Sequence, residues 1–155
     1  GVRGSPASGV STTGLAILRR DGFASMDADA REGTLITRPV RFRGRHLFIN
    51  LDAPRGSLRV ELLNLEGKPI APFTLANCRP VRGDSTRARV QWKGVQELAA
   101  LAGKPVKLRF SLTDGRLYSF WVSPEMTGAS HGYVAAGGPN LSGNTDTVGE
   151  KRSGG

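Results

Sequence analysis

Short runs in which apolar and polar residues alternate, separated by glycine and proline, constrain the fold of this chain most strongly. Residues 46–51 (HLFINL) and 57–62 (SLRVEL) have the period of two that turns one face of a β-strand toward a core. Similar runs occur at 33–42, 104–112 and 116–123, whereas only residues 95–102 have a helical pattern. The sequence therefore predicts an all-β fold, an antiparallel two-sheet β-sandwich of the jelly-roll or concanavalin-like kind.

The chain length and the changes in composition predict a single domain with two flanking segments. The 155 residues can form one sizeable core but hardly two. Residues 1–13 are small and polar, which indicates a flexible linker, and residues 14–124 contain the strand patterns of the sandwich module. Residues 125–155 are rich in glycine, serine and threonine without periodicity, which indicates a tail or an extended arm.

Metal and cofactor chemistry have little support in the sequence. Cys78 is the only cysteine, so neither an internal disulfide nor a cluster of zinc thiolates can form. His46 and His131 are far apart in the chain and lie in no metal-binding spacing. We therefore expect no metal site and no cofactor.

The net charge of +9 raises the question of nucleic acid as a partner, because 17 of the 22 basic residues are arginine. These arginines are scattered, and Arg41, Arg43 and Arg45 alternate as solvent-facing strand residues do. Nucleic acid or another polyanion is therefore the weakest hypothesis. No run of 18 apolar residues exists, so no membrane association is expected either.

Asp114-Gly115 predicts a type I′ β-hairpin that joins the strands 107–113 and 116–123. Pairing across this turn sorts the hairpin into two faces. The predicted core face carries Leu108, Phe110, Leu112, Leu117 and Trp121, and the mixed face carries Lys107, Arg109, Tyr118 and Phe120. Residues 53–56, with Pro54 and Gly56, likewise predict a loop of hairpin length between 46–51 and 57–62.

Three segments together resemble the C-terminal β-sandwich of glycoside hydrolase family 32 and its relatives. These segments are residues 98–122 (LAALAGKPVKLRFSLTDGRLYSFWV), 18–28 (LRRDGFASMDA) and 32–42 (EGTLITRPVRF). The first contains a Leu-x-x-Leu-x-Gly segment and the Leu-Tyr-Ser-Phe core of the two closing strands. The resemblance spans residues 14–123.

The resemblance implies that the chain is not an enzyme. In that family, catalysis takes place in a separate five-bladed propeller with motifs similar to Trp-Met-Asn-Asp-Pro-Asn, Arg-Asp-Pro and Glu-Cys, and none of these occurs here. Arg20-Asp21 is followed by Gly22, and Cys78 is preceded by Asn77. None of the 13 acidic residues lies in a catalytic motif, although retaining hydrolysis needs a pair of carboxyl groups about 5 Å apart. No catalytic residue is therefore expected.

The first functional hypothesis is a carbohydrate-binding accessory module, for which sugar stacking on aromatic rings and directed polar contacts are required. The expected ligand is a polysaccharide or oligosaccharide, such as a fructan or a plant glycan. The candidate ligand-binding residues are Tyr118, Phe120, Trp92, Arg109, Asn77, Arg79, Arg82 and Asp84.

The alternative is a structural module that docks on a catalytic propeller in the same or a neighbouring chain, or that mediates oligomer contacts. For Trp92, burial in a strand is the competing interpretation. By resemblance, an extracellular or periplasmic location is expected.

Overall fold

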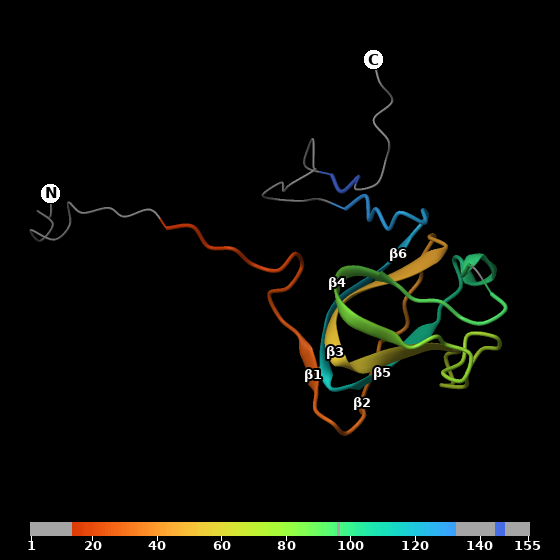
Figure 1. The fold of residues 1–155 in the computed structure, drawn as a ribbon. Coiled ribbons are helices and arrows are strands. Elements are labelled where there is room, and N and C mark those ends of the chain that lie inside the picture. The colour runs from red at the N-terminus through yellow and green to blue at the C-terminus, as the bar shows by residue number, and fades with distance from the viewer. Residues whose placement is uncertain (1–13, 96, 133–144, 148–155) are drawn as a thin grey trace, which may run out of the picture.

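The computed structural model describes residues 14–95, 97–132 and 145–147, so the predicted linker 1–13 and most of the predicted tail lie outside it. Six strands form one antiparallel sheet that curls into a nearly closed barrel (Figure 1). They are β1 (Met26–Ala28), β2 (Gly33–Ile36), β3 (His46–Leu63), β4 (Val81–Arg89), β5 (Lys107–Thr113) and β6 (Gly115–Ser123). The prediction of an all-β, antiparallel fold is confirmed.

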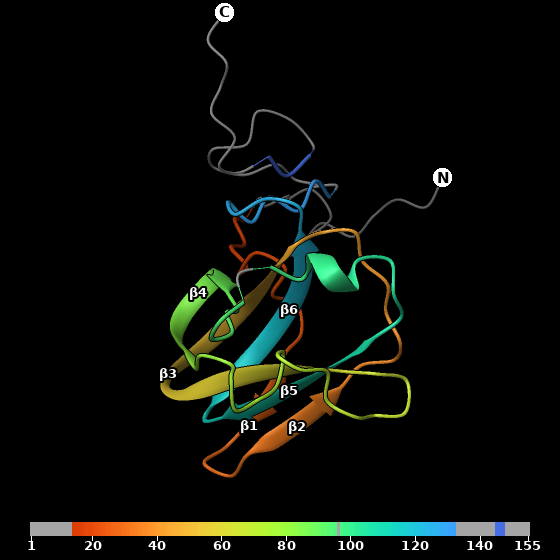
Figure 2. The same cartoon turned by 90° about the vertical axis from the view of Figure 1, so that its right-hand side faces the viewer.

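The long strand β3 is the centre of the sheet, and Figure 2 shows how it bends along its length. Its first half pairs with β6, from His46 with Ser123 to Asp52 with Arg116. Its second half pairs with β5, from Ser57 with Thr113 to Leu63 with Lys107. β4 pairs along the other edge of β3. The loop predicted at residues 53–56 is therefore wrong, because this segment is the bend within one continuous strand.

The predicted hairpin between β5 and β6 is also wrong, since the two strands pair with β3 and not with each other. A type I′ turn needs positive φ at both central residues, but only Asp114 has it, at 43°, and Gly115 does not. A single left-handed residue kinks the chain without reversing it. As a result, β5 and β6 follow one another along the bent β3.

A β-bulge at Tyr118 then changes which side chains of β6 face the core. Asn50 pairs with Ser119 and Leu51 with Leu117, so Tyr118 is the extra residue. Leu117 is buried in the core, and Phe120, which follows the bulge, packs against the core as well. Trp121 therefore lies on the outer face, and its predicted place in the core is wrong. The core positions predicted for Leu108, Phe110, Leu112 and Leu117 are confirmed.

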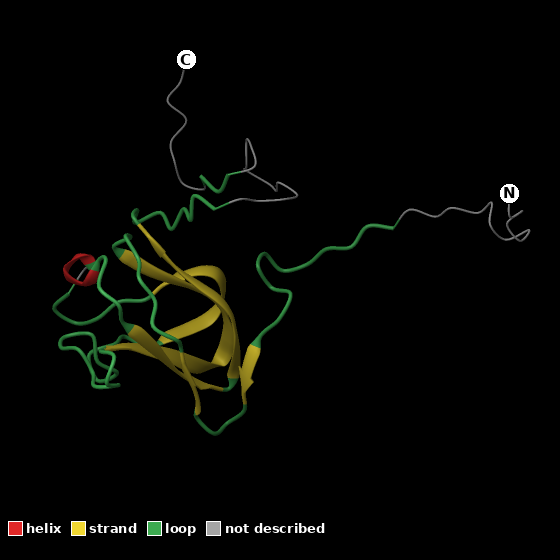
Figure 3. Ribbon diagram, turned by 180° about the vertical axis from the view of Figure 1, so that it is seen from behind, coloured by secondary structure: helices red, strands yellow, loops and turns green. Residues whose placement is uncertain are grey.

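The core fills the inside of the bent sheet, and its main members come from the alternating runs identified in the sequence. Leu47, Ile49, Leu51, Leu58, Val60 and Leu62 of β3 are all buried in it. The region predicted to be helical contains only a 3-10 turn, Ala99–Leu101, the single helical element in the described part of the chain (Figure 3). No helix among the described residues is long and apolar enough to cross a membrane.

Candidate functional site

Two of the predicted ligand-binding aromatics have internal roles. The Trp92 side chain is buried, its indole N–H donates to the Val60 carbonyl at 3.0 Å, and its ring lies edge-on to Phe73. Phe120 packs against Phe110 with a centroid distance of 5.0 Å. The predicted mixed face with two rings therefore does not form, because Phe120 turns inward while Tyr118 does not.

Four of the predicted polar residues are spread over the barrel and do not converge. Asn77 donates from its side chain to the Pro72 carbonyl, and Arg82 donates to the Gly56 carbonyl. The Arg109 guanidinium pairs with the buried carboxylate of Glu61 at 2.6 Å. The Arg79 backbone N–H donates to the Gln91 carbonyl, and its side chain is exposed. These contacts fix turns and neighbouring strands.

The structure does bring Tyr118 and Asp84 together, through Arg19. The Arg19 guanidinium lies 4.7 Å from the centre of the Tyr118 ring and 2.6 Å from a carboxylate oxygen of Asp84. It also donates to the Asn50 side chain and to the Leu51 carbonyl. Asn50 is fully buried and donates in turn to the Arg20 carbonyl. Arg19 thus fixes the N-terminal arm (residues 14–25) to the outer face of the sheet.

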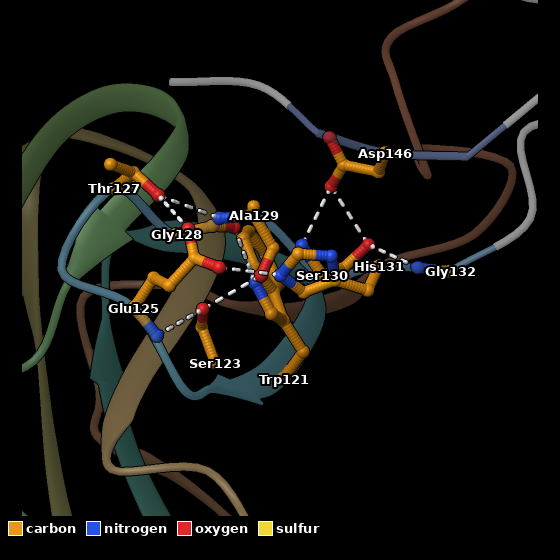
Figure 4. A network of polar contacts seen from close by, with 10 residues as sticks. All are labelled: Trp121, Ser123, Glu125, Thr127, Gly128, Ala129, Ser130, His131, Gly132 and Asp146. Carbon is orange, nitrogen blue, oxygen red and sulfur yellow. Dashed lines mark hydrogen bonds and ion pairs between the residues drawn. The ribbon is translucent and has the colours of Figure 1, made fainter. Parts of the chain in front are cut away.

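A second anchor lies beside the first, between Arg20 and Asp146. The Asp146 carboxylate, only 1% exposed, accepts hydrogen bonds from the backbone and the hydroxyl of Ser130 and pairs with the Arg20 guanidinium at 2.6 Å. Figure 4 shows this aspartate above Ser130 and Gly132. The N-terminal arm, residues 145–147 and the return segment (residues 124–132) are therefore linked by one buried carboxylate.

The return segment covers an aromatic pair on the outer face. Phe48 stacks on Trp121 with ring centroids 5.7 Å apart, and the Trp121 indole N–H donates to the Gly128 carbonyl at 2.9 Å (Figure 4). Gly128 lies so close to Phe48 that a Cβ there would come within 2.9 Å of the ring. The described part of the predicted tail is thus packed on the barrel, with Ala129 fully buried.

Exposed apolar side chains are concentrated near the start of the described chain. Six of the eight large apolar residues that are exposed belong to the N-terminal arm, β1 or β2, namely Leu15, Ile17, Leu18, Phe23, Met26 and Ile36. In the arm itself these side chains are 63 to 88% exposed. Figure 1 shows the arm leading away from the barrel on the side of β1. Several large exposed apolar side chains within a short segment are typical of a site of contact with another molecule.

A groove of about 430 Å³ lies at the bend of β3, and we call it the corner groove. Its charged lining consists of Asp27, Asp29, Asp52, Asp114, Arg55 and Arg116. Arg55 pairs with Asp114 at 3.3 Å and Arg116 with Asp27 at 3.7 Å. The pKa of Arg116 is raised, first by its hydrogen bond with Tyr118 and further by the charges of Asp27 and Asp52. Asp29 pairs with Arg31 at 3.7 Å. With this third guanidinium group, the four carboxylates leave a net charge of −1.

Close backbone contacts fix the shape of the corner groove. A Cβ at Gly56 would lie 1.7 Å from the Thr113 carbonyl oxygen, and one at Gly115 would lie 2.6 Å from the Ala53 Cβ. The Asp114 backbone N–H donates to the Asp29 carbonyl at 2.7 Å, which connects the kink to the chain between β1 and β2. Glycine is therefore required where these segments meet.

The sequence prediction missed the corner groove completely. Its residues come from three segments that are distant in the sequence, namely the end of β1, the bend of β3 and the start of β6, and Asp114 was assigned to a hairpin loop. The available signal was the Asp-Gly pair itself, but its local pattern does not reveal which distant segments converge on it.

Neither a metal-binding cluster nor a similar protein gives further information about this site. In the part of the chain that the structure describes, no three His, Cys, Asp or Glu side chains are grouped so that they could hold a metal ion. Burial raises the pKa of the Cys78 thiol, which disfavours the thiolate at neutral pH. Comparisons with protein-family models, with curated proteins and with solved structures found no match.

Proposed function

We propose that this chain is a non-catalytic accessory module that docks on a second folded domain through its N-terminal arm. The observation that carries the proposal is the anchored apolar surface of the arm. Its backbone is held on the barrel by Arg19 and Arg20, whereas Leu15, Ile17, Leu18 and Phe23 are directed to solvent. Exposing four large apolar side chains is unfavourable for a chain that has no partner.

The proposed partner is a five-bladed catalytic propeller, which the resemblance to glycoside hydrolase family 32 implies. Interfaces between domains are amphipathic, and a mixture of apolar side chains and arginine is common in their centres. The arm has this composition. In this proposal the module supports the catalytic domain and performs no chemistry of its own.

The test compares the chain with a variant in which Leu15, Ile17, Leu18 and Phe23 are replaced by serine. A five-bladed propeller from the same source organism is produced separately, and association is measured by sedimentation velocity. We expect the unmodified chain to form a complex and the variant to lose it, with little change in the melting temperature. The matched control replaces Leu65 and Met126, the two other exposed apolar residues, and is expected to bind normally. Equal binding by the arm variant would contradict the proposal.

A second proposal is carbohydrate binding, and one observation favours it. Tyr118 and Asp84, two of the eight residues predicted from the sequence, meet at Arg19, and the Asp84 side chain is 62% exposed. An aromatic ring beside a carboxylate and a guanidinium group offers contacts that a sugar can use. Titration calorimetry with fructan oligosaccharides and plant glycans tests it. We expect the unmodified chain to give a heat of binding and Tyr118→Ala to give none. If the unmodified chain gives no heat at millimolar sugar, this function is excluded.

A further inference from the structure

An apolar pocket adjoins the corner groove along β1. This edge pocket has a volume of about 110 Å³ and is open to solvent. Its apolar lining comes from Met26, Ala28, Leu35, Phe110, Leu112 and Leu117. β1 pairs with β6 and β2 pairs with β5, so the kink at Asp114 separates the two edge strands. Core side chains consequently line an opening between them.

The corner groove and the edge pocket are adjacent. Asp27 and Ala28 line both of them, so an occupant can enter the pocket and the groove at the same time. One compartment is apolar, and the other has one negative charge in excess once Arg31 is counted with Asp29, although the whole chain has a net charge of +9. The Asp52 carboxylate lies opposite Arg116 in the sheet and interacts with its charge, but it forms no hydrogen bond or ion pair with any other described residue. The site is therefore complementary to a cation that lies next to an aliphatic group.

We infer that these two cavities form one docking site for an extended, basic segment of the partner domain. The segment places an aliphatic side chain in the edge pocket and an arginine or lysine in the corner groove. This inference rests on the proposed docking function, and it specifies the chemistry of the partner. A peptide fits better than a sugar, because no aromatic ring lines the groove and a neutral ligand would leave the excess charge uncompensated.

The geometry of an extended chain sets the spacing of the two recognised side chains. Successive side chains of a strand point to opposite sides, and residues i and i+2 lie on the same side. Both cavities open on the same stretch of β1, so the aliphatic and basic residues should be two positions apart. The probe is therefore the peptide acetyl-Gly-Leu-Ser-Arg-Gly-amide, with two controls in which either leucine is replaced by serine or arginine by glutamine.

The experiment follows the backbone amides of the isotopically labelled chain by NMR during titration with each peptide. We expect the Leu-Ser-Arg peptide to shift the amides around Asp27, Ala28, Asp52 and Asp114 with a Kd of about 1 mM, as is typical of a short flexible ligand. Both control peptides should bind more weakly, and added salt should lower the affinity of the Leu-Ser-Arg peptide. A lack of shifts at these residues, or equal shifts with all three peptides, would overturn the inference.

Two variants separate the compartments. The double variant Asp52→Asn and Asp114→Asn removes two charges, and asparagine tolerates the left-handed backbone of residue 114. It should lower the affinity for the Leu-Ser-Arg peptide about fivefold and reduce the salt dependence of that affinity. Leu35→Phe enlarges a side chain that lines the edge pocket but not the corner groove, and it should abolish the preference for leucine over serine. Glu66→Gln, on an exposed turn away from both cavities, is the charge control and should bind normally.

The outcome can be distinguished from a failure of the proposed function. If the double variant still associates normally with the propeller domain, the docking site is contradicted while docking through the arm stands. If the probe binds as expected but the arm variant also associates normally, the site stands and the role of the arm is contradicted. Shifts of the same amides by a fructan oligosaccharide, without shifts by the peptide, would assign the groove to sugar and overturn the inference.

Discussion

Arginine and aspartate side chains meet at two places in this module, and the two places differ in how the charges are balanced. On the outer face, the Asp146 carboxylate is buried and takes hydrogen bonds from Ser130 in addition to the Arg20 ion pair. In the corner groove, three of the four aspartates pair with arginines at longer distances of 3.3 to 3.7 Å and face solvent, and Asp52 has no ion pair among the described residues. The first arrangement is satisfied within the chain and is suited to holding segments together. The second leaves charge for a ligand to neutralise.

The largest effect is expected where the frame of the corner groove is built. Gly56→Ala places a Cβ 1.7 Å from a backbone oxygen, so β3 and β5 must separate. We expect a loss of about 3 kcal/mol or more in the free energy of unfolding, measured by urea denaturation. The control is Gly67→Ala, where the Cβ has open space but φ is +84°, for which a loss of about 1 kcal/mol is expected. Equal losses in both variants would show that the close contact is not limiting.

The next largest effect is expected at the balanced charge site. Asp146→Asn keeps the size of the side chain but removes the charge that pairs with Arg20, which should cost about 1 to 2 kcal/mol. Limited proteolysis should then cleave the N-terminal arm faster, because one of its two anchors is lost. The control is Asp84→Asn, where the carboxylate is exposed and a loss below about 1 kcal/mol is expected. An unchanged cleavage rate in Asp146→Asn would remove the distinction between the two sites.

A smaller effect is expected for the contact that holds the return segment. Trp121→Phe preserves a ring to stack on Phe48 but removes the N–H donor to the Gly128 carbonyl. The loss should be about 1 kcal/mol, since one neutral hydrogen bond is removed. The measurement is urea denaturation followed by the fluorescence of the remaining Trp92. A loss above about 3 kcal/mol, which is typical of a truncated core aromatic, would place Trp121 in the core after all.

The smallest effect is expected for neutralising the corner groove itself. Asp52→Asn removes a carboxylate without an ion pair of its own among the described residues, so stability should change by less than about 0.5 kcal/mol. The melting temperature measured by calorimetry should be nearly that of the unmodified chain. A clear loss of stability would mean that the groove is balanced internally, as the Asp146 site is, and the contrast between them would disappear.

The sequence was sufficient for the kind of fold but not for its connections. Alternation in β3 correctly identified Leu47, Ile49, Val60 and Leu62 as core residues, because period two is a local property. The pairing of β5 and β6 is not local. Asp114-Gly115 favours a hairpin in isolation. In the folded chain, both β5 and β6 pair with β3 instead of with each other.

The sites were harder to predict for the same reason. The bulge at Tyr118 turns the Phe120 side chain toward the core and the Trp121 side chain toward the outer face. No residue of that segment predicts a bulge. Arg19 reaches Asn50 and Asp84, and Asp146 reaches Arg20, so these anchors join residues that are distant in the sequence. The aspartates of the corner groove converge only once β3 bends. The composition showed the arginines, but their partners depend on the tertiary fold.

The central position of β3 has a consequence for folding. This strand has β5 and β6 on one edge and β4 on the other, and β6 is the last strand of the barrel to be synthesised. His46, near its beginning, finds its partner only in Ser123. Pairings of such long range raise the contact order and slow folding. During synthesis, the apolar strand β3 has an unpaired edge until β6 has been made. We therefore expect chains that are interrupted before residue 115 to aggregate.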